Sequence, residues 1–278
     1  MTPVALLSAL LADAELSDAQ FGRVATMLHR HCGIYLRTGK EGLVRARLAK
    51  RLRKLSLGDF ESYLAIVETD PSRLEFREMV DALTTNKTNF FREPAHFDFL
   101  RREVVPQLGK SPRIWSAGCA TGEEAYSLAM LLNETCSPVA LSNTRILATD
   151  ISQRVLKIAE TGAYGADAVA DIPVALQTRY WKADASSSAG LFHAKPALRN
   201  IMNFARLNLM DQWPMRGPFD AIFCRNVMIY FDKETQQQLV NRFWALLKPG
   251  GHFFVGHSES LSGTSHQFAY VQPAVYTR

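Results

Sequence analysis

The segment RIWSAGCATGEEAYSLAMLLNE, residues 113–134, decides the fold class of this chain. Its first part, RIWSAG (113–118), is a short apolar run ending in a glycine-containing turn, which is typical of a buried β-strand. Its second part, EEAYSLAMLLNE (123–134), predicts an amphipathic helix from the spacing of its apolar residues. Because a strand that turns directly into a helix is half of a β-α-β unit, we expect a parallel sheet here.

The same alternation continues towards the C-terminus. Further strands are predicted at RILATD (145–150), FDAIFCRN (219–226) and GHFFVG (251–256), with helices at about 152–161 and 233–247. This order predicts a doubly wound, Rossmann-like α/β sheet with right-handed crossovers. Residues 179–207 break the alternation with a Ser/Ala/Gly patch and the strand-like runs LFHA and IMNFAR. We therefore expect a small antiparallel β insertion at 179–207.

Residues 1–84 predict a separate, all-helical domain of four or five helices in front of a sheet domain at 85–278. Helix starts are expected where a hydroxyl residue precedes Glu or Gln by three positions, the spacing of a capping box, at Ser17 with Gln20, Thr38 with Glu41 and Ser72 with Glu75. Gly33 and Gly58 are expected helix ends.

The composition is that of a soluble globular protein. Hydrophobic residues make up 47% of the 278 residues and charged residues 21%, which excludes disordered, collagen-like and disulfide-scaffold classes. The four cysteines are widely spaced, so we expect free thiols and no metal site. No basic residue precedes the apolar stretch 4–12, and acidic residues follow it, so we expect neither a signal peptide nor a membrane span, and a cytoplasmic protein.

The net charge of +5 is unevenly distributed. Between Phe21 and Phe60, ten Lys or Arg against two acidic residues give a local charge of +8, which leaves −3 elsewhere. The segment LVRARLAKRLRKL (43–55) predicts a basic helix with six cations, Arg45, Arg47, Lys50, Arg51, Arg53 and Lys54. A solvated helix face explains such a pattern as well as an acidic partner does. RNA is the less favoured partner because no aromatic residue interleaves the cations.

The turn SAGCATGEE (116–124) is the strongest candidate for a ligand site. Small residues such as Gly118 let the backbone approach a ligand, and the following helix offers free amides. A dinucleotide motif is absent, and Glu123 and Glu124 would repel a pyrophosphate. These carboxylates suit a cationic ligand without phosphate, such as S-adenosylmethionine; alternatively, they only complement the helix dipole.

Other polar residues end strands at the same predicted sheet edge. Asp150 follows Gly122 by 28 residues, where a carboxylate commonly holds ribose hydroxyls. Asn208 and the Arg225-Asn226 pair close later strands. Each alone suits a cap or a turn, but together they predict one site beyond the carboxyl ends of the strands.

The junction segment TTNKTNFFRE (84–93) combines small polar side chains with Arg92 and two Phe. It predicts either a second part of the site or a polar linker with Phe90 and Phe91 anchored in the core.

At this point the chain resembles a known family. TTNKTNFFRE, GCATGEEAYSLAM, ATDIS, NLMDQWP, FDAIFCRNVMIYFD and LKPGGHFFVGHSESL, in this order behind a basic helical domain, are similar to the CheR chemotaxis receptor glutamate methyltransferases. The resemblance covers nearly the whole chain. It implies methyl transfer from S-adenosylmethionine to glutamate side chains of chemoreceptor cytoplasmic helices, leaving S-adenosylhomocysteine. It also implies that the basic domain lies on acidic receptor helices, recruiting a cytoplasmic enzyme to its receptors.

The resemblance also implies roles for single residues. Those implied around the cofactor are Asn86, Thr88, Arg92, Glu123, Asp150, Asn208, Leu209, Arg225 and Asn226. Arg92 and Tyr230 are the implied catalytic residues nearest the transferred methyl group.

Two departures from the family pattern are present. Ala125 stands where many members have Pro, which serves mainly as a helix-start residue. ADASSSAG (183–190) replaces the glycine-rich turn of members whose insertion tethers a receptor's C-terminal pentapeptide, so tethering stays open. The alternatives are a nucleic-acid methyltransferase, for which the Asn/Asp-Pro-Pro-aromatic motif is missing, and a non-catalytic receptor-binding adaptor.

Overall fold

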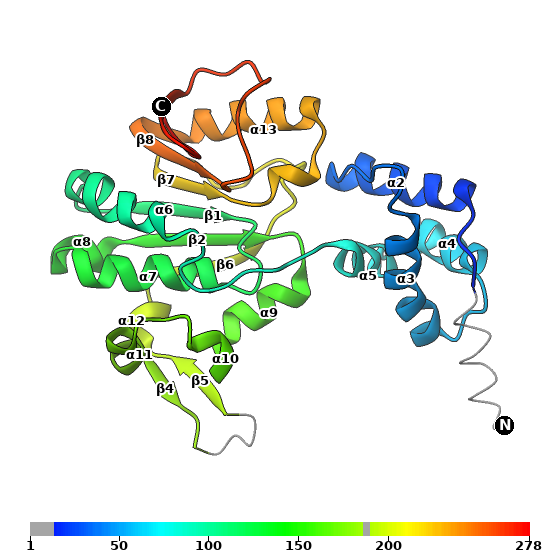
Figure 1. The fold of residues 1–278 in the computed structure, drawn as a ribbon, viewed down its shortest axis with the longest axis horizontal. Coiled ribbons are helices and arrows are strands. Elements are labelled where there is room, and N and C mark those ends of the chain that lie inside the picture. The colour runs from blue at the N-terminus through cyan, green and yellow to red at the C-terminus, as the bar shows by residue number, and fades with distance from the viewer. Residues whose placement is uncertain (1–13, 186–189) are drawn as a thin grey trace. The chain divides into compact units, whose positions relative to one another are not determined.

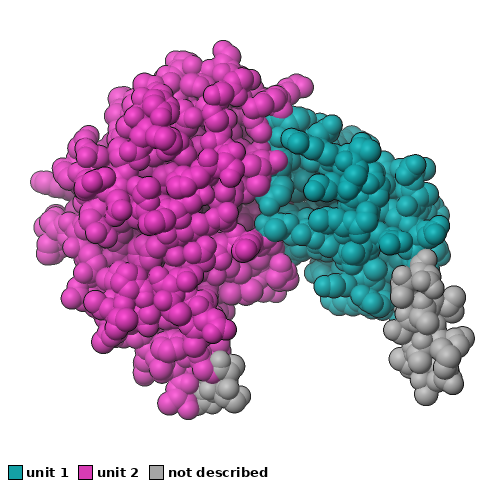
Figure 2. All heavy atoms as spheres, viewed as in Figure 1, with its two compact units in different colours: residues 1–85, 230–232 teal, residues 86–229, 233–278 magenta. Residues whose placement is uncertain are grey.

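The computed structural model describes residues 14–185 and 190–278. The predicted apolar stretch 4–12 and part of ADASSSAG lie outside the described residues. The chain divides into two compact units, Met1–Thr85 with Tyr230–Asp232, and Asn86–Ile229 with Lys233–Arg278 (Figure 2). We call them the helical unit and the sheet unit.

The described part of the helical unit contains four helices, where four or five were predicted for residues 1–84. They are α2 (Asp18–Cys32), α3 (Glu41–Leu55), α4 (Phe60–Thr69) and α5 (Leu74–Leu83). One apolar face of each helix is buried, and the fully buried side chains include Leu28, Leu48, Leu52, Tyr63 and Met79. Within each helix the buried residues recur at three or four positions, as at Val44, Leu48 and Leu52 of α3, which explains why the segments are helical.

The predicted helix boundaries were right in part. Ser17 and Gln20 form the expected capping box, and Gly33 ends α2 in the left-handed conformation with φ 69°. The other two capping boxes were wrong. Lys40 precedes α3 without a side-chain cap, and α5 starts after Arg73, where the Asp70 carboxylate accepts from the Glu75 N–H at 3.2 Å. Gly58 is not a helix end, because Ser56 already takes the left-handed conformation after Leu55.

The sheet unit is built on a seven-stranded sheet in the order β6-β2-β1-β7-β8-β10-β9 (Figure 1). The bounds are β1 (Arg113–Ala117), β2 (Arg145–Asp150), β6 (Met202–Arg206), β7 (Phe219–Cys224), β8 (Leu247–Val255), β9 (Ala269–Gln272) and β10 (Val275–Thr277). The pairs from β6 through β8 are parallel, and β10 is antiparallel to both β8 and β9. This confirms the predicted doubly wound sheet.

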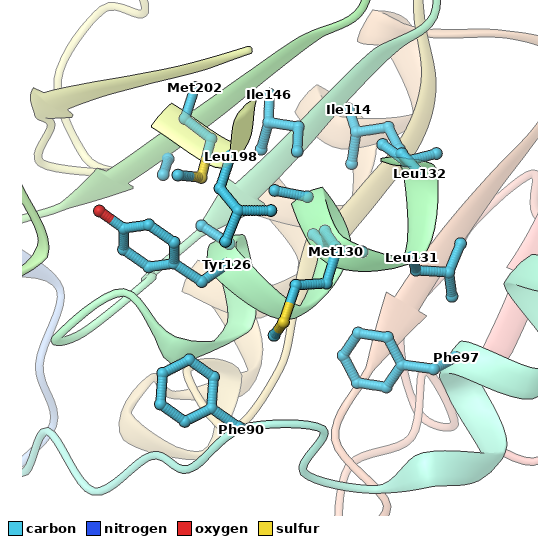
Figure 3. Packing of buried hydrophobic residues seen from close by; sticks show 14 of the residues in the cluster. Phe90, Phe97, Ile114, Tyr126, Met130, Leu131, Leu132, Ile146, Leu198 and Met202 are labelled. Atoms are coloured by element: carbon cyan, nitrogen blue, oxygen red, sulfur yellow. The ribbon is translucent and has the colours of Figure 1, made fainter. Parts of the chain in front are cut away.

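Helices join and cover these strands. They are α6 (Pro94–Phe99), α7 (Glu123–Thr135), α8 (Pro138–Asn143), α9 (Gln153–Thr161) and α13 (Lys233–Leu246). A π-helical turn (Leu100–Val104) and a 3-10 turn (Val105–Gln107) continue α6, and another 3-10 turn (Met228–Tyr230) follows β7. Figure 3 shows Met130 and Leu132 of α7 beside Ile114 of β1 and Ile146 of β2 in the main core.

The small antiparallel sheet exists, but its strands differ from the prediction. It has the order β3-β5-β4, with β3 (Ala163–Gly165), β4 (Trp181–Ala183) and β5 (Leu191–Ala194), and projects from the main sheet (Figure 1). The short helices α10 (Ala166–Val169), α11 (Val174–Tyr180) and α12 (Pro196–Arg199) flank it. IMNFAR was wrongly included in the insertion: it supplies β6, which pairs in parallel with β2. As an edge strand β6 is largely exposed, so it lacks the apolar run of a central parallel strand.

The four cysteines are free thiols, as expected. Across residues 14–185 and 190–278, the chain forms no helix that is both long and apolar enough to cross a membrane.

Candidate functional site

The strand order places the predicted polar residues in one row. Asp150 ends β2, Asn208 follows β6, Gly118 follows β1 and Arg225 follows β7, and these four strands are parallel neighbours. Their carboxyl ends therefore meet at one edge of the sheet, as predicted, where open α/β sheets bind ligands.

The turn after β1 is tightly packed. Gly118 has φ 84°, and a Cβ atom there would lie 2.4 Å from Val227 Cγ2 in the loop after β7. Gly122 has φ 101°, and its Cβ atom would lie 2.8 Å from Ala159 Cβ. The glycines thus allow both the left-handed conformation and the close approach of neighbouring segments. Sequence reasoning connected Gly118 only with a ligand, whereas the structure gives it this packing role as well.

The Asp150 carboxylate is held rigidly beside this turn. Its Oδ2 accepts from the Ala120 N–H and its Oδ1 from the Ser152 N–H, both at 2.9 Å. Asp150 is only 7% exposed. These two contacts fix the orientation of the carboxylate at the end of β2, beside the turn after β1.

The two glutamates at the start of α7 have different surroundings. Glu123 is buried, which raises the pKa of its carboxyl group, and its Oε2 accepts from the Thr121 hydroxyl at 2.6 Å. Glu124 instead accepts from the Ser116 hydroxyl at 2.7 Å and from Arg225 Nη1 at 3.1 Å. Glu124 therefore belongs to a charged network with Arg225, whereas the Glu123 carboxylate accepts from a neutral hydroxyl.

Arg225 is the centre of that network. Its side chain is 2% exposed, and it donates to Glu93 Oε2 from Nε at 3.2 Å and from Nη2 at 3.0 Å. Nη2 also donates to the Arg92 carbonyl. A buried guanidinium needs such compensation, because an unpaired charge in this position would be strongly unfavourable. The guanidinium thus joins the junction segment to β7 and α7, a role that sequence reasoning missed.

Glu93, His96 and His257 also form a cluster with ligand atoms within 4.8 Å of one another. Glu93 already accepts from Arg225 and, through Oε1, from the His257 N–H at 3.2 Å. Burial lowers the pKa of His96 to about 3. The guanidinium beside Glu93 supplies the positive charge that balances this carboxylate, so the ion pair explains the cluster better than a metal ion does.

The junction segment is anchored to α7 by one main-chain contact. The Phe91 N–H donates to the Ser127 hydroxyl at 2.9 Å, and Phe90 is buried against Tyr164 and Trp181, with ring centroids 5.1 and 5.2 Å away. Phe90 is therefore a core anchor, as the reading of this segment as a linker predicted. The polar residues Asn86, Thr88 and Arg92 are partly exposed, and Arg92 Nη1 donates to the Lys87 carbonyl at 2.8 Å.

Asn208 and Leu209 lie in the turn after β6. The Asn208 side chain accepts from the Met210 N–H and donates to Asp211, both at 3.1 Å. The Leu209 carbonyl accepts from Arg242 Nη1 at 2.6 Å. These contacts fix the turn. The turn is also joined to the end of β2, because the Leu207 N–H donates to the Asp150 carbonyl at 2.9 Å.

Tyr230 belongs to the helical unit. Its carbonyl accepts from the Tyr35 N–H at 2.8 Å, and its hydroxyl donates to the Thr85 carbonyl at 3.4 Å. The neighbouring Asp232 carboxylate lies 2.6 Å from His29 Nε2.

The six cations of α3 fall into two groups. Arg45, Lys50, Arg53 and Lys54 are exposed. Arg47 donates to the Leu83 carbonyl at 2.6 Å, and Arg51, whose side chain is 11% exposed, contacts Glu75 and Glu78, each at 2.6 Å. Two of the six thus bind within the helical unit and four face solvent.

The comparisons with known proteins agree over both units. Residues 86–277 match the family model "CheR methyltransferase, SAM binding domain", and residues 19–84 match "CheR methyltransferase, all-alpha domain". A chemotaxis protein methyltransferase of Klebsiella aerogenes is 41% identical over 262 residues, which cover 94% of this chain and 90% of the relative. Chemotaxis protein methyltransferase 2 of Pseudomonas aeruginosa is 41% identical and covers 92% of both chains. This chain therefore belongs to the CheR family and is an S-adenosylmethionine-dependent methyltransferase.

Proposed function

We propose that this protein methylates glutamate side chains on the cytoplasmic helices of chemoreceptors, which yields glutamyl methyl esters. The observation that supports it most is the row of polar strand ends around Asp150, in a chain whose relatives are named for chemotaxis. The reaction would take place in the cytoplasm, where the receptor helices lie.

The residues at this sheet edge suit S-adenosylmethionine. Asp150 offers a fixed carboxylate of the kind that accepts from ribose hydroxyls, and Glu123 offers a carboxylate for a cationic ligand. The turn at Asn208 and Leu209, the loop at Asn226, and the junction residues Asn86, Thr88 and Arg92 are the other proposed contacts. We propose that Arg225 contributes by fixing the position of the junction segment.

When bound, S-adenosylmethionine supplies an electrophilic sulfonium methyl group. A receptor glutamate oxygen forms the new O–C bond, and the electron pair of the broken C–S bond stays on sulfur as S-adenosylhomocysteine. No general base is needed, because a glutamate with an ordinary pKa of about 4.3 is already ionised at pH 7. Catalysis would then consist mainly of alignment and desolvation, with Arg92 and the Tyr230 hydroxyl orienting the reacting groups.

The exposed cations of α3 are the proposed receptor-docking surface. Arg45, Lys50, Arg53 and Lys54 face solvent, so they are available to acidic receptor helices. Arg47 and Arg51, also predicted to dock, are proposed to act indirectly by holding α3 in place. A second proposed contact is a receptor C-terminal pentapeptide on the small sheet, whose outer strands β3 and β4 each have one neighbour.

The test is transfer of tritium-labelled methyl groups to receptor-containing membranes, followed by alkaline treatment. We expect label in the receptor band and its release as methanol, because esters hydrolyse in base. Label on nucleic acid that survives base would support a nucleic-acid methyltransferase instead. Binding of S-adenosylmethionine in calorimetry without any transfer would indicate a non-catalytic adaptor.

Calorimetric titration with the isolated pentapeptide tests the proposed contact of the small sheet with the receptor C-terminus.

A further inference from the structure

The loop after β7, residues 225–229, is bound at two points by a single carboxylate. Glu259 Oε2 accepts from the Asn226 N–H at 2.7 Å, and Oε1 accepts from the Ile229 N–H at 3.0 Å. Oε2 also accepts from the Gly256 N–H at 2.6 Å, just after β8. One side chain therefore joins the carboxyl-end loops of two neighbouring strands.

Glu259 is buried at 9% exposure, where a carboxylate needs compensating donors. Burial raises the pKa of Glu259, and the backbone N–H groups that it accepts from act in the opposite direction. Both oxygens accept hydrogen bonds. An ionised carboxylate suits this arrangement because it carries no hydrogen-bond donor. The contacts thus specify a carboxylate rather than any polar residue of similar size.

The surroundings leave this loop little freedom. Asn226 takes the left-handed conformation, with φ 58°. A Cβ atom at Gly256 would lie 2.5 Å from Asn226 Nδ2 and 2.9 Å from Asn226 N. On the other side, Val227 fills the space beside Gly118. The position of the Asn226 side chain therefore depends on Glu259 and on the absence of a side chain at Gly256.

We propose that Glu259 is a positioning residue for S-adenosylmethionine binding, which holds Asn226 in its binding conformation without contacting the cofactor. The inference rests on the proposed role of Asn226 as a cofactor contact. It adds to that role a set of contacts within the protein that fix the loop, and a loop held in this way loses less conformational entropy on binding.

Calorimetric titration with S-adenosylmethionine tests the inference on two variants of the full chain. Glu259→Gln has the same shape but one acceptor oxygen, and its NH₂ group would face a backbone donor. We expect its Kd for the cofactor to rise by about tenfold and its Tm to fall, because buried backbone N–H groups lose an acceptor. In receptor methylation, the KM for the cofactor should rise more than kcat falls.

Gly256→Ala disturbs the same contacts, because its Cβ atom would lie 2.5 Å from Asn226 Nδ2 and 2.9 Å from Glu259 Oε2, and it should also raise the Kd. Its matched control is Gly165→Ala, because a Cβ atom at Gly165 meets nothing within 4 Å and its φ is ordinary. The control should bind the cofactor normally. If Glu259→Gln does not fold, the Kd of Gly256→Ala for S-adenosylmethionine decides whether the inference holds.

Unchanged cofactor affinity in Glu259→Gln and Gly256→Ala would overturn the inference while leaving the proposed function intact. Failure of the unchanged protein to bind S-adenosylmethionine would instead overturn the proposed cofactor site itself. The two failures are therefore distinguishable in one set of titrations.

Discussion

The Asp150 carboxylate accepts the Ala120 N–H at 2.9 Å, so the end of β2 and the turn after β1 are joined at the proposed cofactor site. The same carboxylate accepts the Ser152 N–H at the start of α9. Asp150 therefore orders the turn, and the proposed cofactor contact would use this same fixed carboxylate.

Asp150→Ala is expected to weaken S-adenosylmethionine binding by about tenfold to a hundredfold. A carboxylate that accepts ribose hydroxyls makes charge-assisted hydrogen bonds worth about 1.5–3 kcal/mol. Calorimetry measures the affinity. A thermal melt measures how far the loss of the two backbone contacts destabilises the fold, so that the two effects can be told apart. Asp167→Ala, at an exposed position on α10, is the control. Unchanged affinity would remove Asp150 from the site.

Tyr230→Phe is expected to fold and to bind the cofactor nearly normally, but to turn over more slowly. The backbone contact to Tyr35 is retained, and only the hydroxyl is lost. Steady-state receptor methylation gives kcat and KM separately. Full activity of the variant would make Tyr230 a packing residue.

Reversal of the exposed cations Arg45, Lys50, Arg53 and Lys54 to Glu is expected to raise the KM for receptor and to leave cofactor affinity unchanged. Receptor methylation should also fall between low and physiological salt, because exposed charges more than about 8–10 Å apart are then largely screened. A gel shift that shows tight RNA binding, with methylation indifferent to the reversals, would contradict the docking surface.

Arg51→Ala is expected to act on stability instead. Arg51 and Glu75 are both nearly buried, and removing one partner leaves an uncompensated charge, at a cost of about 3 kcal/mol. Urea denaturation measures the free energy of unfolding, and Lys50→Ala on the exposed face is the control. Equal stability of the two variants would show that Arg51 does not hold α3 in place.

The buried His96 is expected to make stability depend on pH. Burial lowers its pKa to about 3 in the folded protein, whereas the unfolded value is about 6.5. The unfolded state therefore binds the extra proton between these values, so this contribution is fully present above pH 6.5 and declines as pH falls, by up to about 1.4 kcal/mol per pH unit.

His96→Phe removes this titration and should flatten the pH dependence of the free energy of unfolding between pH 6.5 and pH 3. Denaturation curves at several pH values provide the comparison. A slope equal to that of the unchanged protein would show that His96 is not responsible.

Local patterns predicted much of this protein. Strand and helix periods in residues 113–161 indicated the β-α alternation, because side-chain spacing follows directly from backbone geometry. Parallel strands that alternate with helices place their carboxyl ends at one edge, so Asp150, Asn208 and Arg225 were correctly predicted to share it. The family motifs in the sequence indicated the methyl-transfer reaction.

Other features were decided only by tertiary structure, because they depend on which distant segments pair. IMNFAR has the pattern of an antiparallel strand, and only its pairing with β2 shows that it is a parallel edge strand. Arg47 and Arg53 are indistinguishable as cations of one helix, yet one bonds to the Leu83 carbonyl and the other faces solvent. Glu259 becomes important only where β7 and β8 end side by side, since a carboxylate orders a loop only when folding brings the loop's N–H groups to it.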